Sequence, residues 1–381
     1  MTSIHSGSAA ADRARSYLDA QVARSRAPGL QYAFLGPAGP VLEHAAGWCD
    51  VARGERMSPA TTMMAYSMSK TITAASVLQL VESGAVALDD PLASHVDAVP
   101  YGPDVTVREL LAHTSGIPNP IPLRWVHPAA RHASFDENAA LAAVLRAHPR
   151  LSHPPGTKYA YSNIGYWLLG RLVERASGVT FTGYVRERVL KPLGVTPREL
   201  DYVIPDPACH ATGYLEKYSF MNLAKRLLLD GELIGEYAGR WLSIRSHYVN
   251  GAAFGGLVGT ARGFGRFLQD QLGARSKLLG DEARRLFYER QHVGERTAIA
   301  MTLGWHIGVL QGSRCYYKEG GGGGFHSMMR VYPDASAASV VMANATAFDV
   351  GGCLDAADAL LLAVEGGVAT RREAIGTGGG R

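Results

Sequence analysis

Short hydrophobic segments typical of β-strands lie near both ends of the chain. LQYAFLG (30–36) and PVLEHAAGW (40–48) flank a Pro/Gly turn, which predicts a hairpin. Four further segments of the same character follow one another late in the chain, at 302–312, 314–320, 324–333 and 338–345. Because strands joined by tight connections pair antiparallel, we expect an antiparallel sheet.

The segments between these strands show helical periodicity instead. Residues 12–26 and 352–364 predict helices near the two ends, and residues 255–272 predict a turn followed by a helix. The segment 69–83 is apolar on nearly every side, which is typical of a helix buried in the core. The segment 161–178 has one apolar face, formed by Ile164, Trp167, Leu168, Leu172 and Val173.

This order of elements predicts an α+β fold, an antiparallel sheet flanked by helices with an inserted domain that is mostly helical. We expect residues 12–84 and 251–365 to form the α/β body and residues 85–250 to form the insert. The small and polar residues 1–11 and the glycine-rich residues 366–381 predict flexible ends.

Composition and charge narrow the classes of function. Of the 381 residues, 47% are hydrophobic, which is enough for a large core. The net charge is +4 (38 basic minus 34 acidic residues), and basic residues form no run beyond pairs, which argues against nucleic-acid binding. No segment approaches 18 apolar residues, and the N-terminus lacks the apolar region of a signal peptide, so we expect a cytoplasmic protein that does not enter a membrane.

Cysteine and glycine also bear on the chemistry. The four cysteines (Cys49, Cys209, Cys315 and Cys353) lie far apart with no metal-ligand spacing, so we expect free thiols, no metal and no cofactor. Glycine is over-represented, with 44 residues against a usual share of roughly 7%. Five consecutive glycines occupy 320–324, and this cluster needs an explanation.

Ser67 and Lys70 are three residues apart at the start of the predicted buried helix. On a helix this spacing places both side chains on one face. A serine hydroxyl is a weak nucleophile until a nearby base takes its proton, and a lysine whose pKa is lowered by burial or by a neighbouring cation can be that base. An N-cap serine followed by a surface lysine gives the same pattern, so the motif alone does not decide.

Tyr161 and Asn163 form a second candidate motif. The Tyr161 phenol can take part in proton transfer because it is both donor and acceptor, and the Asn163 amide can donate to a substrate carbonyl. A helix start explains the same residues, with Ser162 or Asn163 as the cap and Tyr161 packing.

Lys318 begins a Lys-Glu-Gly triplet that leads into the glycine cluster. Glycine at a strand edge lets a ligand approach closely, and backbone N–H groups there can stabilise an oxyanion. Neither phosphate-loop pattern, G-x-x-x-x-G-K-[ST] or G-x-G-x-x-G, fits this stretch. A flexible hairpin turn remains an alternative.

Taken in order, S-x-x-K, Y-x-N and K-x-G resemble the motifs of the serine β-lactamase and penicillin-binding-protein superfamily, and most of all its class C β-lactamase and esterase branch. Flanking stretches also look similar, at 110–117, 155–170, 255–267 and 320–329. The resemblance covers residues 12–365 and implies a β-lactamase/transpeptidase-like fold.

The resemblance implies a role for each motif residue. Ser67 would be the nucleophile that becomes acylated, with Lys70 and Tyr161 as its proton-transfer partners. The backbone N–H groups of Ser67 and Gly321 would form the oxyanion hole.

Two further residues of the motifs would help to hold the substrate. Asn163 would position its carbonyl side and Lys318 its reacting centre, and Lys318 keeps the lactamase-like form where many esterase-like relatives carry histidine. We expect His113 to be structural, whereas His326, beside the glycines, either faces the site or is an ordinary strand residue.

Fold does not fix function. The same acyl-serine chemistry serves β-lactam hydrolysis, ester hydrolysis, D-amino-peptide hydrolysis and acyl transfer. With no export signal visible, we expect an esterase or acyltransferase that acts on a small-molecule ester or amide, in specialised metabolism. Aromatic residues at 118–135 and 214–248, among them Trp125, Tyr218 and Tyr248, are candidates for the pocket wall.

Two other functions stay open at this point. One is a β-lactamase or D-amino-acid peptidase. The other is a non-catalytic sensor on a penicillin-binding-like scaffold, although a pure binding module needs no proton-transfer pair. The sequence indicates a small-molecule partner and does not indicate the oligomeric state.

Overall fold

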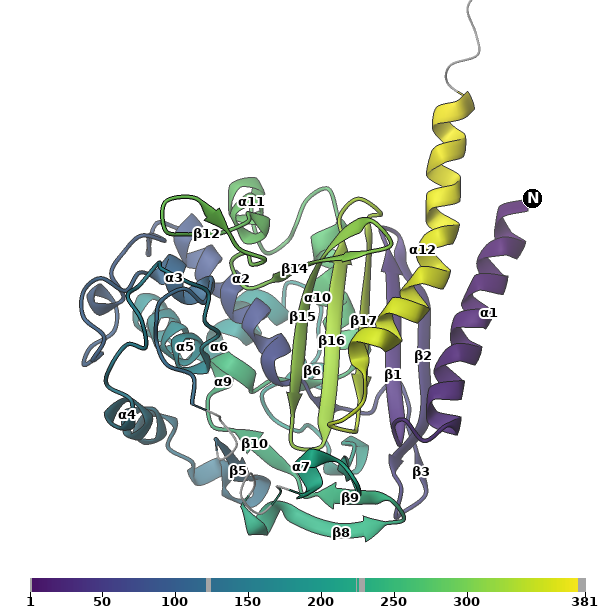
Figure 1. The fold of residues 1–381 in the computed structure, drawn as a ribbon, viewed down its shortest axis with the longest axis horizontal. Helices are drawn as coiled ribbons and strands as arrows, with labels where there is room; N and C mark the ends of the chain where they lie inside the picture. The colour runs from purple at the N-terminus through teal and green to yellow at the C-terminus, as the bar shows by residue number, and fades with distance from the viewer. Residues whose placement is uncertain (1, 121–124, 224, 226–229, 376–381) are drawn as a thin grey trace, which may run out of the picture.

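The computed structural model describes residues 2–120, 125–223, 225 and 230–375. A seven-stranded antiparallel sheet lies at its centre, with strand order β14-β15-β16-β17-β1-β2-β3 (Figure 1). Strands from the two ends of the chain are neighbours, since Leu30 lies opposite Ala343. The antiparallel sheet and the α+β class predicted from the sequence are confirmed. The strands are β1 (Gly29–Gly36), β2 (Gly39–Asp50), β3 (Glu55–Arg56), β14 (His306–Leu310), β15 (Ser313–Gly322), β16 (Phe325–Tyr332) and β17 (Ala337–Ala343).

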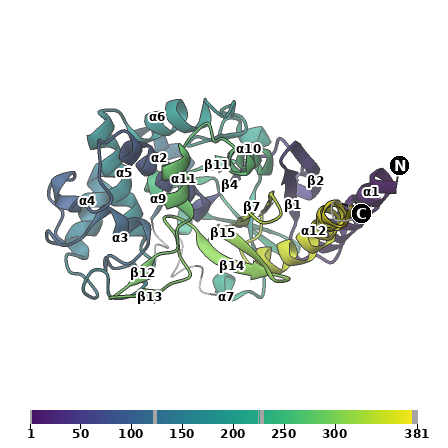
Figure 2. The same ribbon diagram turned by 90° about the horizontal axis from the view of Figure 1, so that it is seen from above.

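Helices cover both faces of this sheet (Figures 1 and 2). α1 (Thr2–Ala23) and α12 (Val350–Ile375) lie on one face, and α10 (Ala261–Leu272) lies on the other. Along β1, Tyr32 packs in the cluster on the α12 side, whereas Ala33 packs in the larger cluster on the α10 side. Because both faces are buried, β1 is a continuous apolar run rather than an alternating one.

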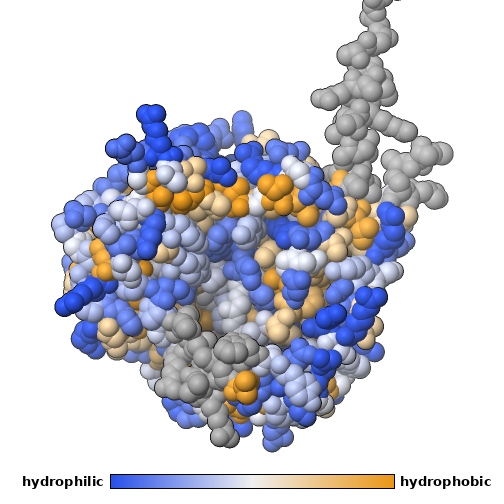
Figure 3. Space-filling view, viewed as in Figure 1, coloured by the Kyte–Doolittle hydropathy of each residue, from blue (hydrophilic) through white to orange (hydrophobic). Residues whose placement is uncertain are grey.

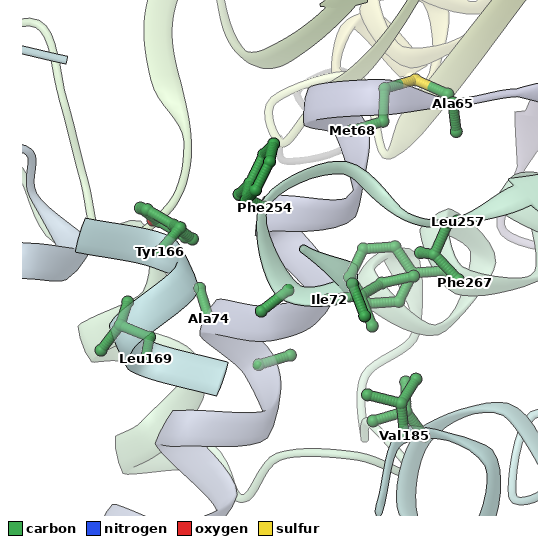
Figure 4. Packing of buried hydrophobic residues seen from close by; sticks show 14 of the residues in the cluster. Ala65, Met68, Ile72, Ala74, Tyr166, Leu169, Val185, Phe254, Leu257 and Phe267 are labelled. Carbon is green, nitrogen blue, oxygen red and sulfur yellow. The ribbon is translucent and has the colours of Figure 1, made fainter. Parts of the chain in front are cut away.

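α2 (Ser69–Glu82) runs through the larger cluster beside the sheet and follows a 3₁₀ turn at Tyr66–Met68. Figure 4 shows side chains of α2, such as Ile72 and Ala74, among those of neighbouring helices. Burial on nearly all sides agrees with the all-apolar pattern of its sequence. The start of this helix is therefore held rigidly.

The remaining strands are short, and the remaining helices vary in length. The other α-helices are α3 (Val107–Leu111), α4 (Glu137–Ala147), α5 (Asn163–Ser177), α6 (Phe181–Val185), α7 (Phe220–Leu223), α9 (Ala252–Gly255) and α11 (Asp281–Tyr288). The small sheets consist of β5 (Val126–Pro128) with β10 (His247–Val249), β7 (Gly213–Glu216) with β9 (Trp241–Ile244) and β8 (Ile234–Ala238), β4 (Met63–Met64) with β11 (Val258–Gly259) and β6 (Leu200–Asp201), and β12 (His292–Val293) with β13 (Thr297–Ala298).

The secondary structure within 85–250 differs from the mostly helical expectation. Its first part is helical, but five of the short strands lie between residues 200 and 249. Strands of two to five residues are too short for a period to be counted reliably in the sequence. The division into a body and an insert stays a prediction.

Both predicted flexible ends contain helix instead. α1 begins at Thr2, and Ala10 is buried against the sheet because an apolar stripe continues back from Leu18. α12 extends to Ile375, beyond the predicted end at 364, and residues 376–381 lie outside the described part. Among the helices that the structure describes, none is long and apolar enough to cross a membrane.

β15 approaches the segment before α2 so closely that residue 320 must be glycine. A Cβ atom on Gly320 would lie 2.1 Å from the carbonyl oxygen of Ala65 and 2.9 Å from the backbone nitrogen of Ser67. The Ser327 hydroxyl on β16 joins the two segments, since it donates to the carbonyl oxygens of Gly320 and Ala65 at 3.1 and 3.3 Å. The glycine cluster therefore brings two backbones together rather than forming a loose turn.

This contact yields a prediction for Gly320→Ala. The added methyl group should push β15 away from Ser67, lower the free energy of unfolding by about 1–3 kcal/mol and abolish any chemistry that needs both segments. Gly231→Ala is the matched control, because no atom of the described residues lies within 4 Å of its added Cβ. Urea unfolding of the two variants checks the prediction, and equal stability would contradict it.

Candidate active site

Ser67 lies in the 3₁₀ turn that leads into α2, where its half-exposed side chain meets residues from two other segments. Lys70 Nζ is 3.0 Å from Ser67 Oγ, and the Tyr161 hydroxyl donates to the same oxygen at 2.7 Å. The structure thus brings the first two sequence motifs together around one hydroxyl. This is the geometry of an activated nucleophile and its proton-transfer partners.

Lys70 is buried and its amine is fixed by three neighbours. Besides Ser67 Oγ, Nζ contacts Asn163 Oδ1 at 2.7 Å and the carbonyl oxygen of Phe254 at 2.7 Å. The two fixed acceptors use both hydrogens of a neutral amine, which leaves its lone pair facing Ser67 Oγ. Burial, together with the charge of Lys318, holds the pKa of Lys70 well below its usual range, so the neutral base is accessible.

Lys318 is equally buried and has no hydrogen-bond partner within the described part of the chain. Its Nζ lies 5.4 Å from the ring centre of Tyr161 and 5.8 Å from that of Tyr166, so aromatic faces supply its nearest electrostatic support. Burial lowers the pKa of Lys318 to about 7. An unpaired amine held beside a nucleophile is a strained arrangement that favours an incoming negative charge.

Tyr161 is held in its protonated form. Burial raises the pKa of its phenol, although the hydrogen bond to Ser67 works in the opposite direction. His113 packs against the phenol ring at a centroid distance of 4.3 Å. Tyr161 is therefore a proton donor at this position, suited to return a proton to a departing group.

His113 is fully buried behind Tyr161, and its Nδ1 faces the backbone N–H of Ser162 at 3.2 Å. Burial and the charges of Lys318 and Lys70 hold the pKa of His113 well below its usual range. The imidazole is neutral and buried and accepts a hydrogen bond from the backbone. This position fits a structural role for His113, which is what the sequence analysis expects.

Asn163 begins α5, with Ser162 as the N-cap residue. Its Oδ1 accepts from Lys70, and its Nδ2 donates to Asn119 Oδ1 at 3.1 Å. The motif indicated a donation from the Asn163 amide to a substrate carbonyl, and this stays a prediction. The motif did not indicate the contacts of the amide with Lys70 and Asn119. The amide orients the Lys70 amine, and Asn119, which no motif marked, orients the amide.

A cavity of about 310 Å³ opens beside Ser67, and Figure 3 shows a hollow near the centre of this face. Gly321 lines the cavity together with Ser67, so the two backbone groups proposed for the oxyanion hole border the same space. The other described residues around the cavity are Tyr66, Trp125, Val126, Asn163, His247, Val249, Phe254, Gly255, Gly322, Gly323 and Thr346.

Of the four pocket candidates from the sequence, only Trp125 lines the cavity. Tyr218 is 85% exposed, and Tyr248 instead stacks on His132 and accepts from the backbone N–H of Ile204 through its hydroxyl oxygen. His326 contacts Glu319 Oε1 and the carbonyl oxygen of Phe348, each at 2.6 Å, on the α12 side of the sheet. Alternation along β16 explains this last error, because neighbouring residues point to opposite faces.

Sequence reasoning missed three cavity residues with large side chains. The Tyr66 hydroxyl and His247 Nε2 form a hydrogen bond of 2.9 Å in the cavity wall. Phe254 packs against Trp167 of α5, although the two residues lie far apart in the sequence. Tyr66 precedes the nucleophile directly, which is a signal that was available. Nothing in the sequence places His247 or Phe254 near Ser67.

Comparison with known proteins decides the family. The family model described as Beta-lactamase matches residues 14–364. The chain belongs to the Beta-lactamase family. Its curated relatives include Protein flp of Staphylococcus aureus strain N315, 32% identical over 157 residues, and a D-aminopeptidase of Brucella anthropi, 32% identical over 191 residues. These matches cover 39% and 50% of this chain but only 30% and 36% of the relatives.

Solved structures of this superfamily share the fold. A D-amino acid amidase from Ochrobactrum anthropi SV3 matches with a TM-score of 0.75 and 21% identity, over 95% of this chain and 99% of the other. EstCE1, described as a hydrolase with promiscuous acyltransferase activity, matches with a TM-score of 0.69 and 18% identity, over 93% and 99%. SurE matches with a TM-score of 0.71 and 26% identity, over 95% and 77%.

The geometry at Tyr161 makes a testable prediction. Tyr161→Phe removes the hydroxyl that donates to Ser67 and should lower kcat/KM for an activated ester by about 10²–10⁴-fold, with little change in stability. Tyr166→Phe is the matched control, because the Tyr166 hydroxyl donates to the Leu111 carbonyl instead. The control should lose about 1 kcal/mol of stability and keep its activity. Unchanged kinetics in Tyr161→Phe would show that Tyr161 only packs.

The burial of Lys318 predicts how stability depends on pH. The amine has a pKa of about 7 in the folded state and about 10.4 in an unfolded chain. Between these values the unfolded chain binds more protons, so stability rises with pH. Lys318→Met should therefore stabilise the fold most below pH 7, by roughly 1–4 kcal/mol, and progressively less toward pH 10.

Denaturant unfolding at pH 6 and pH 9 measures this difference, and ester hydrolysis is assayed on the same samples. We expect the variant to be more stable but impaired in activity. A Lys318→Met protein that is less stable than the parent at pH 6 would contradict the assignment of Lys318 as an unpaired buried amine.

Proposed function

We propose that this Beta-lactamase family member is a serine hydrolase or acyltransferase that cleaves a small-molecule ester or amide through acyl-Ser67. The observation that carries the proposal is the fixed Lys70 amine, whose neutral form directs its lone pair at Ser67 Oγ. Two buried amines and a tyrosine around one serine cost stability, and a binding module gains nothing from that cost.

The acylation step follows from the contacts. Ser67 Oγ attacks the substrate carbonyl carbon while its proton passes to Lys70 Nζ. The carbonyl oxygen takes on negative charge beside the N–H groups of Ser67 and Gly321. When the intermediate collapses, the bond to the leaving group breaks, and that group leaves with a proton from the Tyr161 hydroxyl. Lys70 then gives the proton that it took from Ser67 to the Tyr161 oxygen, so that both groups end as they began.

The second half-reaction uses the same groups in reverse. Water, or an alcohol or amine acceptor, occupies the space left by the departed group and attacks the acyl carbon. Its proton passes to the Tyr161 oxygen as Tyr161 passes its own proton to Lys70. Lys70 then returns a proton to Ser67 Oγ as the bond between Oγ and the acyl carbon breaks. The chemistry is the same for each acceptor, so hydrolysis and transfer compete for one acyl-enzyme. EstCE1, a fold neighbour described with both activities, supports this view.

Amide hydrolysis of D-amino compounds is the second candidate. It is favoured by the D-aminopeptidase among the curated relatives and by the D-amino acid amidase among the fold neighbours. β-Lactam hydrolysis uses the same acyl-Ser67 and remains an alternative.

Intact-mass analysis tests the proposal. The protein is incubated with p-nitrophenyl butyrate, with and without an excess of a primary amine or alcohol, while a Ser67→Ala variant serves as the control. We expect a butyryl adduct on Ser67 in the parent only, and products divided between butyrate and the acceptor conjugate. Absence of any adduct from both the ester and a serine-directed phosphonate, in folded protein, would refute an acyl-serine enzyme. Free acid alone with every acceptor would refute the transfer activity.

A further inference from the structure

We propose that the cavity beside Ser67 is the acyl pocket for an uncharged, apolar acyl group, and that it discriminates against acyl groups bearing a free ammonium. This inference rests on the proposed acyl-Ser67 chemistry. It concerns which acyl donors the site accepts, and it separates the two candidate functions, because a D-amino acid amide with a free amino group carries a cation next to its reacting carbonyl.

The position of the cavity assigns it to the acyl side of the substrate. Tyr161, which protonates the leaving group, does not line the cavity, and neither does Lys318. Ser67, Gly321 and Asn163 do. The substrate carbonyl fits between Ser67 Oγ and the N–H of Gly321. When its leaving group points toward Tyr161, its acyl chain must extend in the other direction, into the cavity.

The wall facing this chain is apolar and aromatic. Trp125 packs against Phe254 with ring centres 5.8 Å apart, and Trp167 packs behind both at 5.8 and 5.2 Å. Val126 and Val249 face each other across the β5–β10 ladder and complete this side. Gly321–Gly323 also line the cavity and contribute no side chains of their own, although the Tyr66 ring packs against Gly322. A branched or aromatic acyl group buries its surface well against such a wall.

No carboxylate lines the cavity among its described residues. Two acids of neighbouring segments already have partners: Glu319 is paired with His326 on the α12 side, and Glu137 accepts from Trp167 Nε1 behind the wall. An ammonium in this space would therefore have no counter-charge.

The polar groups that do reach the cavity are neutral or positive. Tyr66 and His247 bond each other, and burial lowers the pKa of His247, which keeps its imidazole uncharged. Lys70 and Lys318, behind the nucleophile, already place two amines in one buried region. A third amine adds repulsion.

Three esters, one without and two with an ammonium group, test the inference. p-Nitrophenyl 3-phenylpropionate and the p-nitrophenyl esters of D- and L-phenylalanine have the same carbon skeleton. Rates of acylation are measured at pH 6 and pH 9, and each rate is divided by that ester's rate in buffer alone. An α-amino group with a pKa of about 7.7–8.0 is charged at the first pH and neutral at the second. Comparing the esters at one pH cancels the enzyme's own titration.

We expect the 3-phenylpropionyl ester to react at least about 100-fold faster at pH 6, and the difference to shrink at pH 9. Equal rates at pH 6, or a faster phenylalanyl ester, would overturn the pocket assignment while leaving acyl-Ser67 intact. If neither these esters nor a phosphonate modifies Ser67, the proposed function fails as well, and the two failures are thus distinguishable.

Val249→Glu provides a second test, since it places a carboxylate in the cavity wall. The preference for the 3-phenylpropionyl ester at pH 6 should fall or reverse. Val309→Glu is the control, because Val309 is 71% exposed on β14 and does not line the cavity. A folded Val249→Glu protein that reacts with the phosphonate but keeps the parent's preference would also overturn the assignment.

Discussion

Two buried lysines, Lys70 and Lys318, determine how the site must be built. Each amine is fully removed from solvent, and burying an amine is costly unless neighbours compensate or the proton is released. Lys70 is compensated by two fixed oxygen acceptors, whereas Lys318 has only the faces of Tyr161 and Tyr166. The outcome is an amine next to Ser67 whose pKa is held well below its usual range, which favours the neutral form that a general base requires.

Such an arrangement persists only because the surrounding backbone is rigid. α2 is buried along most of its length, so the 3₁₀ turn that carries Ser67 has few alternative positions. β15 is fixed against that turn at Gly320, where the Ser327 hydroxyl joins the two segments. Rigid placement of donors and base before the substrate arrives lowers the reorganisation needed in the reaction. The glycine cluster serves the chemistry by its lack of side chains.

The sequence predicted the centre of the site better than its wall, and there is a physical reason. Ser67, Lys70, Tyr161 and Lys318 belong to short motifs whose spacing and order can be read directly. The central sheet was also predictable, since its strands are long enough for their pattern to be visible. Trp125, His247 and Phe254 reach the cavity from three separate segments, and only tertiary packing brings them together.

The errors have the same origin. Tyr218 and Tyr248 are aromatic residues of the segment 214–248, which the sequence predicts to contribute to the pocket. Aromaticity does not say whether a side chain faces solvent, core or cavity. His326 lies on β16, next to the strand that carries Lys318, but its side chain points to the α12 side of the sheet. A shift of one residue in register decides to which face a side chain points. Asn119 escaped notice because it acts through Asn163, and a contact between two polar side chains leaves no periodic signal.

The arrangement of the site separates two kinds of selectivity. Tyr161, which donates to Ser67 Oγ, lies outside the lining of the cavity, whereas the apolar wall borders the cavity beside Ser67. Changes in the wall can therefore alter which acyl group binds without altering the pKa of the base. The acceptor must approach on the side of Tyr161, where the groups are set by the chemistry itself. The cavity wall can thus vary while the groups around Ser67 stay fixed, in keeping with the rule that a fold alone does not set the substrate.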